Sequence, residues 1–174
     1  MMKKYFLLKE DYNVENRVKF KDFTTSKKAI FLKEDVEILR DMADMYIDSD
    51  ENTIFPALIE SPVLMISEEL YDLFNLYEEN ITYKIVVFSD IKREIQKVYR
   101  LMVPEVIDGL SEKTTYTKSN WLDNMVLDKN KVGDNNIFRI KAALDYYLVV
   151  SLDVAEAILK RDFQGIIFKE VEVV

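Results

Sequence analysis

IFRIKAALDYYLVVSLDVAEAILKRDFQGIIFKEV, residues 137–171, carries the pattern that decides the fold. Residues 137–140 alternate apolar and polar side chains, as a half-buried strand does. Residues 146–150 are a continuous apolar run, which predicts a strand covered on both faces. Ser151 then stands at a helix N-cap position, ahead of an apolar stripe at helical spacing. Gly165 permits a left-handed turn, so the pattern predicts strand, turn, strand, short helix and strand.

A second stretch of the chain repeats this order. A short apolar run ends at Ser67, an amphipathic helix follows it, and residues 82–88 are rich in β-branched side chains. The two stretches align without a gap at Ser67 with Ser151, Glu69 with Asp153, Leu70 with Val154, Phe74 with Ile158, and Tyr83 with Ile167. The alignment is explained either by two strand–Ser–helix–strand units or by chance similarity between amphipathic patterns.

The remaining segments complete the predicted fold. Tyr5–Leu8 is expected to be a strand near a sheet edge, because lysines flank it. Apolar residues recur at helical spacing from Glu34 to Tyr46, which predicts a helix. Residues 94–103 fit a strand that ends before Pro104. The whole predicts one α+β domain over residues 1–174, with a mixed or antiparallel sheet and two or three packed helices.

Composition excludes several classes of function. The 174 residues include no Cys and no His, which removes disulfides, thiol nucleophiles and the common catalytic triads. The net charge of −8 opposes binding to nucleic acid or to anionic membranes. No apolar run is long enough to span a bilayer, and no signal-peptide pattern follows the first residues. We therefore expect a cytoplasmic protein.

Two segments resemble calcium loops without meeting their requirements. In the loop that starts at Asp48, Thr53 occupies the position that requires Gly, and Ile59 replaces the bidentate Glu. In the loop that starts at Asp128, Gly133 is in place but apolar and basic residues occupy ligand positions. The first segment is interpreted as a solvated acidic loop and the second as a turn. No metal ion and no organic cofactor is expected.

The motifs available to an enzyme are few. Thr25–Lys28 and Thr115–Lys118 both have a hydroxyl-x-x-Lys spacing, but no convincing helix follows either one. The sequence has no nucleophile elbow and no Gly-rich phosphate loop. Lys or Tyr bases and paired carboxylates stay open as routes to catalysis, since 32 acidic residues always place some pairs close in space. No catalytic residue is assigned.

The two quoted units carry a family resemblance. The long stretch above and the segment PVLMISEELYDLF, residues 62–74, are similar to a family of bacterial immunity proteins, which are encoded beside contact-delivered toxins and neutralise them. The similarity extends from Phe55 to the C-terminus and is weak over the first 50 residues. Its fixed points are Phe138, Arg139, Ser151, Gly165 and Phe168. The resemblance implies a binding protein and transfers no active site.

The expected partner is a cognate protein toxin, and the acidic charge favours a basic one. We expect a monomer or a weak homo-oligomer. Loops on a rigid scaffold commonly hold recognition residues, and aromatic side chains are favoured anchors. The predicted partner-binding residues are Asp48, Asp50, Glu51, Tyr116 and Trp121. Two other functions stay open, a general cytoplasmic interaction or scaffold domain and a carboxylate-dependent enzyme.

Overall fold

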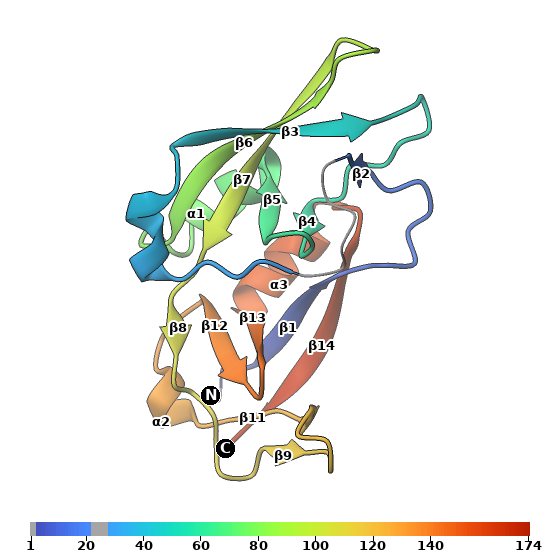
Figure 1. Cartoon of the computed structure of the whole chain (residues 1–174). Helices are drawn as coiled ribbons and strands as arrows, with labels where there is room; N and C mark the ends of the chain where they lie inside the picture. The colour runs from blue at the N-terminus through green and yellow to red at the C-terminus, as the bar shows by residue number, and fades with distance from the viewer. Residues whose placement is uncertain (1–2, 22–27) are drawn as a thin grey trace.

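The computed structural model of the chain describes residues 3–21 and 28–174. Two curled six-stranded sheets lie one above the other in Figure 1, with short helices packed against them. The predicted α+β fold with mixed strand pairing and two or three helices is confirmed, but the strands form two six-stranded sheets where one sheet was predicted. The helices are the α-helices α1 Glu68–Asn75, α2 Lys129–Val132 and α3 Leu152–Leu159, and the 3₁₀ helix η1 Lys33–Ile38.

The lower sheet, called sheet A, has the strand order β11-β14-β1-β13-β12-β8. Its neighbours are antiparallel except for the parallel pairs β11–β14 and β12–β8. Its strands are β1 Tyr5–Glu10, β8 Val106–Ile107, β11 Val126–Leu127, β12 Ile137–Ala142, β13 Asp145–Ser151 and β14 Ile166–Val173. The N-terminal strand β1 therefore lies in the middle of the sheet, and its predicted position near an edge is wrong.

The upper sheet, called sheet B, has the order β2-β3-β6-β7-β5-β4. Only β3 and β6 are parallel neighbours. Its strands are β2 Lys19–Phe20, β3 Met42–Asp48, β4 Leu58–Ile59, β5 Met65–Ser67, β6 Thr82–Asp90 and β7 Ile95–Val103. A separate hairpin consists of β9 Thr115–Tyr116 and β10 Leu122–Asn124.

The largest apolar cluster joins the two sheets. It takes residues from β1 and β13 of sheet A, from β4, β5 and β7 of sheet B, and from both α1 and α3. Phe74 of α1 and Ile158 of α3 are both buried in it. Each sheet also has one smaller apolar cluster on its far side, formed by residues such as Phe138 in sheet A and Phe88 in sheet B. Burial of these side chains is the main force that holds the two layers together.

Both sheets contain the same five-strand arrangement, here called a module. Module B has the order β3-β6-β7-β5-β4, and module A has the order β11-β14-β1-β13-β12. The first pair is parallel in each module, and the next three pairs are antiparallel. In each module a helix joins the two strands that flank the central one, α1 between β5 and β6 and α3 between β13 and β14. The N-terminal strand β1 takes the place in module A that β7 has in module B.

The register identifies equivalent residues in the two modules. Ser67 pairs with Tyr99, and Ser151 pairs with Tyr5. Both tyrosines are buried, and both hydroxyls donate to a backbone carbonyl just before the fifth strand in the module's order, β4 or β12. Tyr99 donates to Pro56 at 2.7 Å, and Tyr5 donates to Asn135 at 3.0 Å. The two strand–Ser–helix–strand units expected from the sequence are therefore present.

The gapless alignment of the units is wrong after the helix. The strand pairs Tyr83–Met102 and Leu8–Phe168 make Phe168 the equivalent of Tyr83, one residue beyond the predicted Ile167. Gly165 lies in the connection that holds the extra residue. It has φ +80°, and a Cβ there would lie 2.6 Å from a carbon of Pro56, so only Gly fits.

Three local predictions need correction. The helix expected over Glu34–Tyr46 is a 3₁₀ helix followed by β3. Pairing with β6 overrides the helical pattern, in which only Met45 is buried. Ser67 caps α1 through the amide of Leu70, but the Ser151 hydroxyl donates to Asn136 Oδ1 and makes no capping bond. The turn expected at Asp128 is the short helix α2, with Asp128 as its N-cap.

None of the helices in the two described ranges is long and apolar enough to cross a membrane.

Candidate partner-binding face of sheet B

The predicted partner-binding residues lie in two places. Asp48 ends β3 and Asp50 and Glu51 follow it, whereas Tyr116 and Trp121 belong to the β9–β10 hairpin. Figure 1 shows β3 and this hairpin at opposite ends of the molecule. Asp48 forms an ion pair with Lys21, and Asp50 accepts hydrogen bonds within its own turn. The five residues therefore cannot form one compact contact surface.

The hairpin residues remain accessible. Trp121 and Tyr116 are both exposed, and the Trp121 amide donates to Thr117 Oγ1 at the hairpin turn. The hydroxyl-x-x-Lys spacing at Thr115 gives no dyad here, because the Thr115 hydroxyl donates to Asp123. The other such spacing, Thr25–Lys28, lies mostly outside the described residues.

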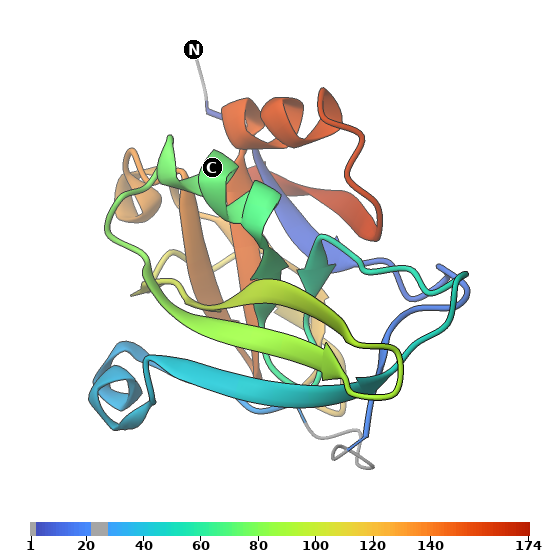
Figure 2. The ribbon, with the colours of Figure 1, turned by 90° about the horizontal axis from the view of Figure 1, so that it is seen from above.

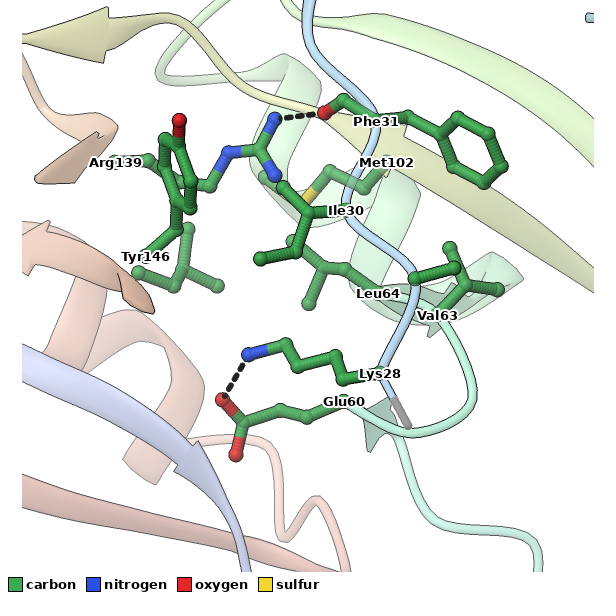
Figure 3. A pocket seen from close by; sticks show the side chains of 11 residues that line it. Lys28, Ile30, Phe31, Glu60, Val63, Leu64, Met102, Arg139 and Tyr146 are labelled. Carbon is green, nitrogen blue, oxygen red and sulfur yellow. Dashed lines mark hydrogen bonds and ion pairs between the residues drawn. The ribbon is translucent and has the colours of Figure 1, made fainter. Parts of the chain in front are cut away.

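A small cavity between the sheets holds an unusual buried cation. Arg139 of β12 is only 4% exposed, and its guanidinium donates to the carbonyl of Phe31 (Figure 3). Its Nε has no hydrogen-bond partner among the described residues, and burial lowers the pKa of Arg139. Lys28 and Glu60 pair at the other end of the cavity. The cavity volume is about 10 Å³, which is room for about one water molecule and excludes an organic substrate.

Within the described residues, no group of three or more acidic side chains is arranged to hold a metal ion. Glu10 and Glu60 are the closest to a carboxylate pair, but each accepts a hydrogen bond from the other's backbone amide. Burial raises the pKa of Glu10, and Arg17 pairs with it. These carboxylates tie β1 to the segment after β4 and do not face an open cleft.

The most distinctive surface is an apolar area on sheet B, here called the open face. It consists of Met42 and Tyr46 of β3, Ile85 and Val87 of β6, and Val98 of β7. These side chains share one side of the sheet because the register places Met42 beside Ile85, and Val87 beside Val98. Helix α1 packs on the same side of sheet B, where its Tyr71 contacts Tyr83 of β6 edge-to-face. The helix covers only one end of the open face. Figure 2 looks from above onto β3, β6 and β7, and no helix overlies them.

Solvent reaches much of this apolar area. Met42 is 56% exposed, Tyr46 44% and Val98 42%. One side of an antiparallel or mixed sheet can face water, but the exposed side of such a sheet is normally polar. Contiguous exposed apolar surface on a protein commonly marks a binding site.

Acidic side chains border the open face. Asp44 lies on it between Met42 and Tyr46, and Glu69 and Asp72 project from α1. These three carboxylates make no ion pair with any described residue, whereas Glu68 of α1 is held by Arg100, which raises the pKa of that guanidinium. The charge available to a partner is therefore negative.

A hollow of about 740 Å³ adjoins the face where α1, β7 and the segment after α3 meet. Its lining includes Val98 from the open face. Four acidic and two basic side chains line it, namely Glu68, Glu69, Asp72 and Asp162, with Lys97 and Arg161. The open face and this hollow together present an apolar floor with an acidic border.

The equivalent surface of module A is charged. The pairs Ile85–Arg100 and Phe6–Glu170 make Glu170 the equivalent of Ile85, and the same register makes Glu172 the equivalent of Val87. Lys4 precedes β1 as Val98 precedes Tyr99. Lys4 and Glu170 form an ion pair at 3.1 Å on the surface. The architecture therefore does not require apolar residues at these positions.

Sequence reasoning missed the open face because it assigned β3 to a helix. In a helix, Met42 and Tyr46 would belong to an apolar stripe that faces the core. In the strand β3, their side chains face solvent beside β6. One available signal was the alternation of Met45 and Ile47 with polar Asp44 and Asp48. The chain matches no protein-family model, and no curated protein sequence matches it.

Proposed function

We propose that this protein is an immunity protein that binds a basic protein toxin through the open face and neutralises it without turnover. One observation carries the proposal. Module B has the half-buried Ile85 and Val87 and the exposed Val98 where module A has Glu170, Glu172 and Lys4. Since exposed apolar side chains bring no advantage to an unbound protein, their retention in one module is explained by a partner.

The charge of the border suits a basic partner. Asp44 lies on the apolar floor, Glu69 and Asp72 lie at the end where α1 packs, and the whole chain carries −8. Complementary charge raises the association rate, while buried apolar and aromatic anchors supply most of the affinity. Met42, Tyr46 and Val98 are suitable anchors. The resemblance of residues 55–174 to immunity proteins gives the partner its class.

Neutralisation needs no chemistry from this chain. A protein bound over a toxin's catalytic surface or substrate path blocks it by exclusion, and tight binding is sufficient. This agrees with a chain without His or Cys, in which the cavity beside Arg139 has room for about one water molecule.

Growth protection tests the proposal. The protein encoded beside this chain is expressed as the toxin candidate, together with wild type, Val98→Lys or Ile167→Lys. Val98 and Ile167 are equally exposed, at 42%, but Ile167 belongs to module A. Wild type and Ile167→Lys should restore growth, whereas Val98→Lys should not.

The measurement has two contrary outcomes. If the neighbouring protein is not toxic, or if wild type does not restore growth, the immunity function is wrong and a general interaction domain replaces it. If Val98→Lys protects as well as wild type does, the toxin binds elsewhere on the chain. Melting temperatures of both variants check that each one is folded.

A further inference from the structure

The outer edge of β3 is long and has little cover. Among the described strands, β8, β11, β4 and β2 end the two six-stranded sheets, and each has only two residues. The eight-residue strand β14 also has a largely uncovered outer side, since β11 pairs only with Glu172 and Val173, but β14 carries Lys169 and Glu170 there. The seven-residue strand β3 is paired on its outer side only near its C-terminal end, where Lys19 and Phe20 oppose Asp48 and Ile47. No described residue pairs with the outer side of Met42–Met45. Met42, Ala43 and Asp44 are all exposed.

Backbone direction shows which groups this edge presents. The Ile85 amide donates to the Asp41 carbonyl, so the odd-numbered residues of β3 bond to β6. The Lys21 amide donates to the Tyr46 carbonyl, which confirms that even-numbered residues point outward. The amides and carbonyls of Met42 and Asp44 are therefore directed away from the sheet. Their side chains lie on the open face beside Tyr46.

Within Met42–Tyr46 the edge carries a single charge, Asp44, and none of the other usual protections against strand pairing. Natural edge strands are short, or they carry Lys, Pro or a bulge that prevents another chain from pairing with them. The sequence of β3, MADMYID, contains no Lys and no Pro, and its register with β6 is continuous from Met42 to Tyr46. An unprotected edge that borders an apolar face supplies both hydrogen bonds and side-chain contacts to an added strand.

We propose that an extended segment of the toxin pairs with Met42–Tyr46 as an additional strand of sheet B. This inference rests on the proposed function, since it names the binding mode at the same face. Side chains directly opposite each other on neighbouring strands share one face. The toxin segment therefore carries Lys or Arg opposite Asp44 and apolar residues opposite Met42 and Tyr46, in the pattern apolar-x-basic-x-apolar.

A second copy of this chain fits the edge less well. The antiparallel register that pairs all of Met42–Tyr46 with itself places Asp44 opposite Asp44, and like charges opposite each other destabilise a strand pair. Each copy also carries −8, which repels another copy at low ionic strength. A basic toxin segment avoids both the contact between two Asp44 carboxylates and the repulsion between two acidic chains.

Met42 offers a matched pair of variants. Its amide points outward and it is the first residue of an edge strand, a position at which sheets accept Pro. Met42→Pro removes the hydrogen-bond donor and obstructs an added strand, whereas Met42→Ala shortens the side chain and keeps the donor. Met42→Pro should weaken toxin binding at least 10-fold more than Met42→Ala does, with both variants folded. Equal weakening by the two would overturn strand pairing.

A peptide probe tests the pattern without the toxin. The blocked heptapeptide Thr-Val-Thr-Lys-Thr-Val-Thr is titrated into the isotope-labelled protein, with a Glu-for-Lys peptide as control. The Lys peptide should slow hydrogen exchange of the Met42 and Asp44 amides, and it should bind more than 10-fold more tightly than the Glu peptide. The Asp44→Lys variant should reverse this preference.

The outcomes separate the binding mode from the proposed function. Loss of growth protection in Val98→Lys but not in Met42→Pro leaves the immunity function standing and overturns strand pairing. Loss of growth protection in both Val98→Lys and Met42→Pro supports both the immunity function and strand pairing. A peptide that perturbs only other surfaces overturns the edge site. Slowed exchange at Met42 and Asp44 that depends on protein concentration, with no peptide present, would assign the edge to a second copy.

Discussion

Modules A and B share one arrangement of strands and differ in what they leave uncovered. Each has a central strand with a buried tyrosine, Tyr5 or Tyr99, whose hydroxyl donates to a carbonyl just ahead of the fifth strand, β12 or β4. On the sheet surface that its helix leaves uncovered, module A has the ion pair Lys4–Glu170, and module B has Ile85 and Val98. The internal contacts that the two modules share maintain the fold, whereas the uncovered positions are free to serve binding.

The two modules also differ at their edges. Module A ends in β11, which has two residues, and the loop after Gly109 lies against it through the Ser111 amide and the Val126 carbonyl. Module B ends in β3, which has seven residues and extends past β2. One copy of the arrangement thus ends in a two-residue strand and is charged on its face, and the other ends in a seven-residue strand and is apolar on its face.

The largest effect should come from the helix residues that the modules share. Phe74→Ala and Ile158→Ala each leave a void in the core between the sheets, and they should cost about 3–5 and about 2–5 kcal/mol of unfolding free energy. Urea titration followed by circular dichroism measures both. Because the cluster includes both helices, each variant should unfold in one transition. A separate transition for one module would contradict the shared core.

Exchanging the uncovered residues should affect binding more than stability. Ile85→Glu with Val98→Lys gives module B the charges that Glu170 and Lys4 give module A. The double variant should bind the toxin at least about 30-fold more weakly, as expected when interface anchors worth about 2 kcal/mol are lost. Its unfolding free energy should stay within about 1 kcal/mol of wild type, because surface changes are usually small. Unchanged affinity would remove the functional contrast between the modules.

The central tyrosines should respond alike. Tyr5→Phe and Tyr99→Phe each remove one hydroxyl from a backbone carbonyl, at a cost of about 1 kcal/mol. The cost is measured by chemical denaturation at neutral pH. A large cost at one site and none at the other would mean that the two hydrogen bonds are not equivalent in energy.

The Tyr5 hydroxyl also predicts a pH dependence. Burial, with a smaller contribution from Asp134, raises the pKa of Tyr5 to about 12. A raised folded-state pKa contributes stability below the unfolded value near 10, and this contribution is lost as the pH rises from about 10 to about 12. The stability difference between wild type and Tyr5→Phe should therefore shrink over that range, which denaturation at several alkaline pH values would show.

Local patterns were sufficient for much of the fold. The cap positions of Ser67 and Ser151, the apolar stripes of both helices and the strands that follow them agree with the structure. These elements are set by residues close in sequence. The capping bond of Ser151 was predicted wrongly because its hydroxyl has a partner, Asn136, 15 residues away in the chain.

The candidate site could not be predicted in the same way. The open face depends on the parallel pairing of β3 with β6, which brings Met42 beside Ile85 from 43 positions farther along the chain. Short apolar segments fit a helix or a strand equally well by periodicity, and long-range pairing decides between them. The loop residues Asp48 and Trp121 were chosen for composition alone, and no local signal indicated that they lie at opposite ends of the molecule.

The smallest expected effect concerns a lysine that the modules share in position but not in pairing. The strand pairs Lys84–Leu101 and Lys169–Leu7 make these lysines equivalent, but only Lys84 has a carboxylate partner among the described residues, namely Asp41 at 2.6 Å. The hydrogen bond from Lys84 lowers the pKa of Asp41 below its ordinary value. A lowered folded-state pKa contributes stability above the unfolded pKa, and this stability is lost as the pH falls through the folded pKa.

Lys84→Met should return the pKa of Asp41 to its ordinary value in an NMR titration, whereas Lys169→Met should leave it unchanged. Asp41 is almost fully exposed, so solvent screens the pair and the change in stability should be slight. An equal response to both substitutions would mean that the overall charge of the chain, and not this pair, sets the pKa of Asp41.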